Sequence, residues 1–135
     1  MAETKVDWEK LRQTAIEAAH NAYAPYSEYQ VGVAAITDSG KTLSACNVEN
    51  ASYGLTLCAE CGLVSLLHAS GGGKLSAFTC VDGTGKLAMP CGRCRQLLLE
   101  HAADGMLIET DQGIETIEDI LPNAWGPKTL AEARE

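Results

Sequence analysis

The chain has 135 residues, 46% of them hydrophobic, and a net charge of −8, which fits one globular domain spanning residues 1–135. A chain this acidic repels phosphate backbones and anionic lipid surfaces, so we expect neither nucleic acid nor membrane as a partner. No apolar run approaches the roughly 20 residues that span a bilayer, and the first ten residues are too polar for a signal peptide. We therefore expect a cytoplasmic protein whose six cysteines serve as metal ligands, catalytic groups or small core residues rather than disulfides.

The first third of the chain predicts a helix followed by a β-hairpin. Asp7 can cap a helix whose apolar residues recur at three- and four-residue intervals, and Pro25 should end it. Residues 31–37 and 41–48 are short, partly β-branched runs separated by the tight-turn sequence DSG. We expect these two runs to pair as antiparallel strands.

The remaining chain predicts strands that alternate with helices. Leu63, Leu66 and Leu67 form one apolar stripe of a helix over residues 58–70, and Pro90 should occupy the first turn of another helix. Strands are expected at 76–82 and 106–110, followed by a turn at Gly113, a short strand, a short helix near 117–122 and an irregular tail. This order predicts an α/β fold, a three-layer α/β/α domain with a mixed sheet of about five strands.

Two Cys-x-x-Cys pairs, Cys58 with Cys61 and Cys91 with Cys94, stand at the starts of two predicted helices. Both helix starts can aim thiolates at a common point, where the helix dipoles stabilise negative charge, so one zinc ion between them is expected. Four thiolates would close a structural site, whereas three would leave the fourth position to water in a catalytic site. The spacing alone leaves both alternatives open.

Glu60, two residues after the first cysteine, favours the catalytic alternative. A closed site has no use for a carboxylate beside the metal, but a bound water needs a proton acceptor. A solvated first-turn glutamate, favoured only by the helix dipole, is the alternative interpretation. The pattern C-A-E followed by P-C-x-x-C matches the three-cysteine form of the signature of zinc-dependent nucleobase deaminases.

The chain resembles the small homotetrameric cytidine deaminases from about residue 20 to the tail. The motifs AYAPYSEYQVG, CNVENASYGLT, CAE and PCGRCRQ occur in the order and spacing of that family. The resemblance implies a zinc ion held by Cys58, Cys91 and Cys94, and a proton-shuttling Glu60. It also implies a small nucleoside substrate, a role in pyrimidine salvage, and a homotetramer with shared active sites.

Further substrate-binding residues are implied by the same resemblance: Tyr29, Asn47, Glu49, Ala51, Tyr53 and Trp125. Asn47 and Glu49 offer a donor and acceptors suited to ribose hydroxyls, so a nucleoside is expected rather than a free base. Tyr29 would pack on the pyrimidine, where the family usually has phenylalanine. Trp125 would reach the active site of an adjoining subunit, although a role in pinning the tail is the alternative.

Cys61 departs from the family pattern, which commonly places arginine immediately after C-A-E to offset the thiolate charge. Three thiolates on one divalent ion leave a net charge of −1, which would make the metal a poorer acid toward water. Arg93 is our first candidate for charge compensation and Arg95 the second, unless both simply face solvent. Cys61 also keeps the closed four-cysteine site open as an alternative.

The expected function is zinc-dependent hydrolytic deamination of cytidine and 2′-deoxycytidine to uridine and 2′-deoxyuridine, with release of ammonia. Glu60 would carry a proton to the pyrimidine ring nitrogen and then one to the leaving amine. The alternatives are a deaminase of another aminopyrimidine nucleoside, such as the blasticidin type, and a structural zinc module without catalysis. The histidines lie away from the ligand spacing and are expected at the surface or its boundary: His20, His68 and His101.

Overall fold

A five-stranded mixed sheet forms the centre of the protein in the computed structural model, which describes residues 5–134. Its strands lie in the order β2-β1-β3-β4-β5, with bounds Val31–Thr37 (β1), Thr42–Cys46 (β2), Leu75–Asp82 (β3), Ala102–Thr110 (β4) and Gly113–Thr116 (β5). β3 and β4 pair in parallel, and the other neighbours pair antiparallel. The mixed sheet and the predicted hairpin of β1 and β2 are both confirmed.

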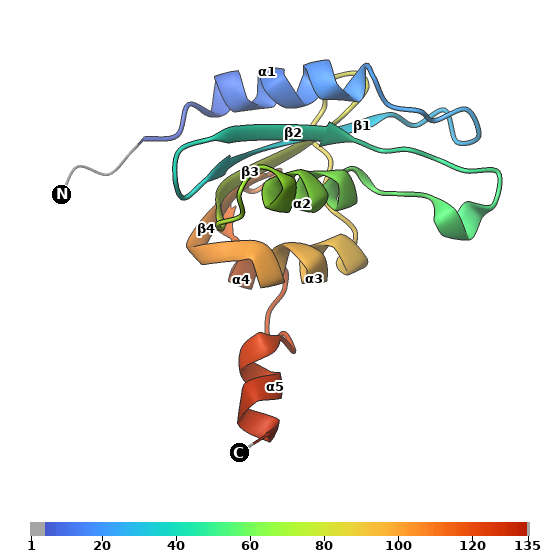
Figure 1. Ribbon diagram of the computed structural model, residues 1–135. Helices are drawn as coiled ribbons and strands as arrows, with labels where there is room; N and C mark the ends of the chain where they lie inside the picture. The colour runs from blue at the N-terminus through green and yellow to red at the C-terminus, as the bar shows by residue number, and fades with distance from the viewer. Residues whose placement is uncertain (1–4, 135) are drawn as a thin grey trace.

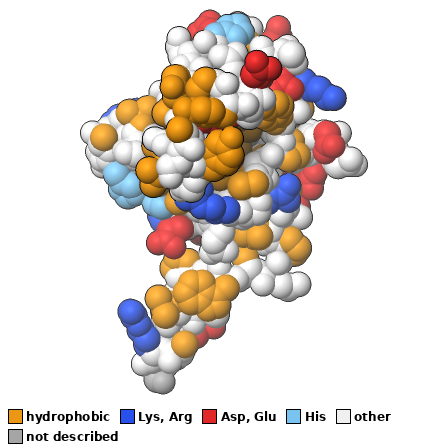
Figure 2. Space-filling view, turned by 90° about the vertical axis from the view of Figure 1, so that its right-hand side faces the viewer, with side chains coloured by type: hydrophobic (Ala, Val, Ile, Leu, Met, Phe, Trp, Pro, Cys, Tyr) orange, Lys and Arg blue, Asp and Glu red, His pale blue; other side chains and the backbone are white. Residues whose placement is uncertain are grey.

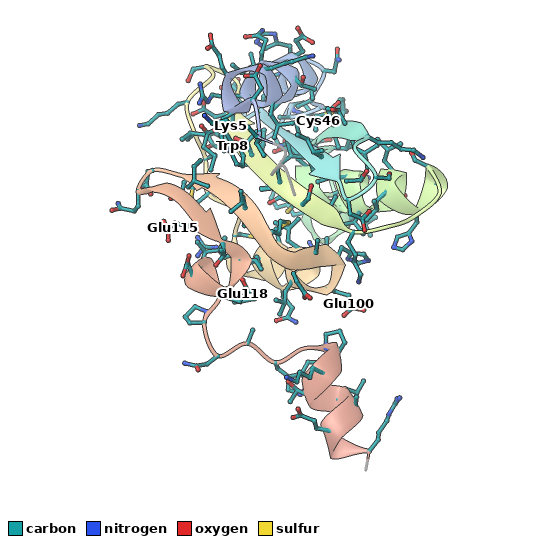
Figure 3. The ribbon with its side chains drawn as sticks, turned by 90° about the vertical axis from the view of Figure 1, so that its left-hand side faces the viewer. Lys5, Trp8, Cys46, Glu100, Glu115 and Glu118 are labelled. Carbon is teal, nitrogen blue, oxygen red and sulfur yellow. The ribbon has the colours of Figure 1, made fainter. Side chains whose placement is uncertain are left out.

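Helices cover both faces of this sheet, as the views in Figures 1 and 3 show. One face carries α1 (Trp8–Ala19), and the other carries α2 (Ala59–Ala69) and α3 (Gly92–His101). A short helix, α4 (Ile117–Ile120), follows β5 and contacts β4 and α3. The predicted three-layer α/β/α architecture is therefore confirmed.

Two buried layers hold the helices on the sheet, because successive strand residues point to opposite faces. Val33 and Phe78 pack with α2 and α3, whereas Ala34 packs with α1. The layer under α1 is thin: a methyl group added at Gly32 would lie 2.0 Å from the carbonyl oxygen of Ala15. The helix thus rests directly on the backbone of β1.

A buried carboxylate, that of Glu109, anchors α1 to the sheet. Glu109 of β4 is almost completely buried and accepts hydrogen bonds from the Arg12 Nε, at 3.1 Å, and from the Thr79 hydroxyl, at 2.8 Å. Because a buried carboxylate is costly without partners, this network ties α1 to β3 and β4 in one arrangement.

The predicted start of α1 is confirmed, but its predicted end at Pro25 is wrong. The Asp7 side chain accepts a hydrogen bond from the Lys10 amide at 3.1 Å, as an N-cap does. The helix ends at Ala19 because Tyr23 leaves it to donate its amide to the Asn47 carbonyl at 3.0 Å. Residues 20–30 consequently form a loop beside β2 rather than two more turns of helix.

Three local expectations also need correction. Pro90 precedes the helix start, since Cys91 is the N-cap of α3. Leu66 is exposed, whereas Leu63 and Leu67 are buried, so the apolar stripe of α2 is narrower than predicted. The tail is not irregular: residues Pro127–Ala133 form a helix, α5, which projects away from the sheet and its covering helices (Figure 1). Within residues 5–134, no helix is long and apolar enough to cross a membrane.

Candidate active site

Three cysteines meet where α2 and α3 begin. Cys58 is the N-cap of α2, Cys91 is the N-cap of α3, and Cys94 lies in the first turn of α3. Their sulfur atoms all lie within 4.8 Å of one another. The two helices pack side by side on the same face of the sheet, and this packing brings together residues more than thirty positions apart.

This donor set fits zinc. With Zn–S bonds of about 2.3 Å, the sulfurs of a tetrahedral site lie about 3.8 Å apart, which small side-chain movements reach from the observed separation. The amides of Cys94 and Arg93 lower the pKa of the Cys91 thiol, whereas burial raises the pKa values of Cys58 and Cys94. Metal binding must therefore displace protons from the thiols of the half-buried Cys58 and the buried Cys94, and its affinity will rise with pH.

Glu60 lies in the same cavity as the three cysteines, with only 4% of its surface exposed. Burial raises the pKa of its carboxyl group above the ordinary value, because the charged form loses hydration. A raised pKa brings the carboxyl closer to the range in which it can both take up and release a proton at neutral pH. The alternative of a solvated surface glutamate is excluded by this burial.

The cavity has a volume of about 210 Å³ and opens toward a second hollow of about 340 Å³. Tyr29 and Asn47 line the first together with the cysteines, whereas Glu49 and Tyr53 line the second. Thr56 lines both. The two hollows are therefore neighbours that meet at Thr56, and together they are called the cleft below.

Asn47 and Glu49 already hold the loop that precedes β1. Asn47 Oδ1 accepts from the Val31 amide at 2.9 Å, and its Nδ2 donates to the Tyr29 carbonyl at 3.0 Å. The Glu49 carboxylate accepts from the amide of Tyr26 at 3.0 Å and from the amide and hydroxyl of Ser27. These bonds, with that of the Ser27 hydroxyl largest, lower the pKa of Glu49, so it is anionic at neutral pH.

The other predicted substrate residues are not all in the cleft. Tyr29 and Tyr53 line it, although both are largely exposed, at 52% and 76%. Ala51 lies in an exposed bend and lines neither hollow. Trp125 is 59% exposed and lines a separate groove of about 590 Å³ on the outer side of α2 and α3.

Cys61 stands apart from the cysteine cluster. Its side chain lines the outer groove rather than the cavity, and the Arg93 guanidinium approaches its sulfur at 3.9 Å. Among the described residues, the cluster of three or more side chains able to hold a metal comprises Cys58, Cys91 and Cys94 and does not include Cys61. This arrangement favours a site open to water over a closed four-cysteine site.

The two arginine candidates for charge compensation differ in their contacts. The positive charge of Arg93 lies near the cluster, because the thiols of Cys61, Cys58 and Cys94 raise its pKa. Arg95 instead donates to the backbone carbonyls of Pro90 at 2.8 Å and Ile120 at 2.9 Å. Arg95 therefore braces the turn before α3 and links it to α4.

Comparison with known proteins agrees with this geometry. Residues 5–110 match the family described as "Cytidine and deoxycytidylate deaminase zinc-binding region". The chain belongs to this family. A cytidine deaminase from Mycobacterium tuberculosis is 53% identical over 129 residues, which cover 96% of this chain and 97% of that relative. Another, from Halalkalibacterium halodurans, is 36% identical over 125 residues, covering 89% and 95%.

Solved structures of such deaminases share the fold. The crystal structure of cytidine deaminase from M. tuberculosis superposes with a TM-score of 0.87 at 54% identity, covering 90% of this chain and 99% of that one. The cytidine deaminase from Mycobacterium leprae gives a TM-score of 0.85 at 51% identity, covering 88% and 100%. The cysteine cluster described above thus lies in a zinc-binding deaminase domain, and zinc is its cofactor.

Several residues that line this cleft had no assigned role in the sequence analysis, among them Tyr26, Ser27 and Thr56. Tyr26 and Ser27 line the second hollow, and Thr56 joins the two hollows. Tyr26 and Ser27 lie within the motif AYAPYSEYQVG, so the motif marked their position without indicating their contacts. Tyr26 also packs edge-to-face on Tyr53, with ring centres 6.1 Å apart, which orders the rim of the cleft.

Proposed function

We propose that the protein catalyses hydrolytic deamination of cytidine and 2′-deoxycytidine to uridine and 2′-deoxyuridine, with release of ammonia. The observation that carries the proposal is a buried carboxylate, Glu60, in one cavity with three thiols at two helix starts. The relatives named cytidine deaminases support this reaction over the blasticidin type. The proposal treats residues 1–135 as one deaminase domain with a role in pyrimidine salvage.

Glu60 performs the proton transfers in this proposal. Zinc held by Cys58, Cys91 and Cys94 would lower the pKa of a water molecule to about 7. Glu60 takes the proton from the attacking water and gives it to the pyrimidine ring nitrogen, which makes the amine-bearing carbon electrophilic. Glu60 then takes the second proton from the hydroxyl group that has added to this carbon and delivers it to the exocyclic amine. The C–N bond breaks, ammonia leaves as a neutral molecule, and the carbon keeps the oxygen as a carbonyl group.

The charges of the cleft favour a nucleoside over a nucleotide. Among the described residues, no lysine or arginine lines either hollow, and the anionic Glu49 lies in the second one. A phosphate on the sugar would meet this carboxylate without a cation to offset its charge. The Glu49 carboxylate already accepts three hydrogen bonds from the loop, and a hydroxyl group of a sugar can donate to its remaining lone pair, which a free base would leave unused.

Cytidine turnover tests the reaction and its metal dependence together. We expect cytidine absorbance to fall as ammonia appears, to stop after chelation, and to resume when zinc is returned. Cytosine and cytidine 5′-monophosphate serve as matched substrates and should react much more slowly. Zinc-restored protein that leaves cytidine unchanged would refute the proposal. A thiol titration of the zinc-loaded protein distinguishes the catalytic site from a structural one. A closed four-cysteine site would protect Cys61 from the thiol reagent, whereas an open three-cysteine site would leave it reactive.

We also propose that the active enzyme is a homotetramer whose neighbouring chains complete each cleft. Aromatic and aliphatic side chains gather on the face around residues 20–30 and 48–57 (Figure 2), with Tyr53, Leu55 and Leu57 more than half exposed. Such a surface is typical of a protein interface. An isolated seven-residue helix is marginal in water, so α5, which projects from the domain, also needs a partner.

Mixing of subunits tests the shared sites. Trp125→Ala should weaken cytidine binding if Trp125 serves a neighbouring cleft, since it lies outside the cleft of its own chain. Mixing inactive Glu60→Gln with Trp125→Ala subunits should then restore some sites of wild-type affinity. Light scattering that shows a fully active monomer, or mixtures that never complement, would contradict the assembly. None of the six cysteines, all within the described residues, is paired in a disulfide, which supports a reducing compartment such as the cytoplasm.

A further inference from the structure

Two imidazoles meet at the opposite ends of the helices that carry the cysteine cluster. His68 lies in the last turn of α2, and His101 ends α3. Their ring centres lie 5.1 Å apart and the ring planes cross at 80°. His68 is exposed and His101 is half-buried, so both rings can be reached from solvent.

A backbone contact selects the tautomer of one ring. His101 Nδ1 lies 3.1 Å from the carbonyl oxygen of Leu97, which can only accept a hydrogen bond. In the neutral ring the proton therefore resides on Nδ1, and Nε2 presents a lone pair. Histidines that bind metals are usually oriented in this way, with the second nitrogen donating to a carbonyl or carboxylate.

The separation of the rings matches the geometry of a shared metal ion. Zinc–nitrogen bonds are about 2.0–2.1 Å long, and a ring nitrogen lies about 1.1 Å from its ring centre. Two imidazoles on a tetrahedral ion consequently have ring centres about 5.2 Å apart. Without an ion the rings meet edge-to-face at 5.1 Å, so metal binding needs the exposed His68 ring to rotate until one nitrogen of each ring faces the ion.

We propose that His68 and His101 form a second, weaker metal site, for a divalent ion of the zinc, nickel and copper class, with water as the remaining ligands. Imidazole is a preferred ligand of these ions, and the carboxyl ends of two helices attract positive charge. Lys74 would repel the ion, because a hydrogen bond of 2.9 Å to the Glu100 carbonyl holds its positive ammonium group near the end of α3. Glu100, the residue before His101, is exposed at the edge of the domain (Figure 3).

An ion at this site would join the carboxyl ends of α2 and α3, while zinc joins their amino ends through the cysteines. Metal binding should therefore make the packing of these helices more stable, through linkage between binding and folding. The site is independent of the deamination proposed above, because neither imidazole lines the cleft.

The test uses zinc-loaded protein, with Ni²⁺ as the probe in equilibrium dialysis. Nickel and zinc are both counted, so that nickel that merely replaces zinc at the cysteines can be subtracted. The remaining bound nickel should approach one ion per chain. Since second-shell changes alone weaken metal sites about 10–100-fold, His68→Gln and His101→Gln should each weaken nickel binding at least about tenfold. His20→Gln, at the end of α1, is the matched control and should bind nickel normally.

Nickel binding that survives both substitutions, or that falls equally in His20→Gln, would overturn the proposal. Proton NMR of the wild-type protein provides a second measurement that does not depend on the folding of variants. Paramagnetic Ni²⁺ should broaden the ring signals of two of the three histidines at concentrations that leave the third sharp. Equal broadening of all three, or none, would also overturn it.

Discussion

Glu60→Gln separates the proton-transfer role of Glu60 from its role in packing. Glutamine preserves the size and the hydrogen-bonding capacity of a side chain that is 4% exposed, but it cannot accept a proton. General acid–base catalysis contributes about 10²–10⁴-fold, so we expect kcat for cytidine to fall at least about 10²-fold. That loss corresponds to about 2.7 kcal/mol or more in activation free energy. Steady-state kinetics, with zinc content measured on the same sample, gives the result.

Two controls make this result specific. Glu118→Gln, on the exposed surface of α4, removes the same charge elsewhere and should leave kcat unchanged. Glu60→Gln should not lower the free energy of unfolding of the metal-free protein, because it removes a carboxyl group whose charged form is penalised by burial. A zinc-loaded Glu60→Gln protein with near-normal kcat would refute the proton-transfer role.

Two other substitutions test the charge beside the cluster and the packing of α1. Arg93→Ala removes a positive charge beside Cys61, so deprotonation of the attacking water should need a higher pH. The acidic limb of the pH profile of kcat should therefore move to higher pH. An unchanged limb in folded, zinc-loaded protein would show that another group compensates the thiolate charge. Gly32→Ala places a methyl group 2.0 Å from a backbone oxygen of α1, which should cost about 3 kcal/mol of unfolding free energy in denaturant titration. Stability equal to wild type would mean that α1 does not rest on β1 as described.

The parts of the fold that the sequence predicted well are those with strong local signals. β1 is an almost continuous apolar run buried by helices on both faces, and a tight turn joins it to β2. The end of α1 was mispredicted because it is decided by Tyr23, whose backbone partner lies on the segment after β2. The helix α5 was missed because its seven residues include a single large apolar side chain, Leu130, and therefore carry little hydrophobic periodicity.

The chemistry of the site was predictable to a different degree for each residue. The cysteine spacing and Glu60 predicted the cluster, because helix starts fix the direction of their first side chains. The separation of Cys61 could not be predicted, because its spacing from Cys58 also suits a common ligand set. Its position depends on the packing of α2 against α3, which leaves Cys61 facing Arg93 in the outer groove.

Asn47 shows most clearly how a predicted substrate residue can have a structural role as well. Both ends of its amide bind the backbone on either side of Gln30, through Tyr29 and Val31, and thereby set the position of the Tyr29 ring. Asn47→Asp keeps the acceptor for the Val31 amide but replaces the donor with an oxygen facing the Tyr29 carbonyl. We therefore expect Tyr29 to move and kcat/KM for cytidine to fall about 10²-fold, as misplacement by about 1 Å can cost.

Sugar analogues distinguish positioning by Asn47 from direct contact with the substrate. Asn47→Asp is compared with wild type on cytidine and on analogues that each lack one sugar hydroxyl. If Asn47 acts only by holding the loop, the substitution should lower kcat/KM by the same factor on every substrate. The effects of the substitution and of the missing hydroxyl are then independent. If its amide also binds one hydroxyl, removal of that hydroxyl should cost the variant less than it costs wild type. Full activity on every substrate would show that the hydrogen bonds of Asn47 do not position Tyr29.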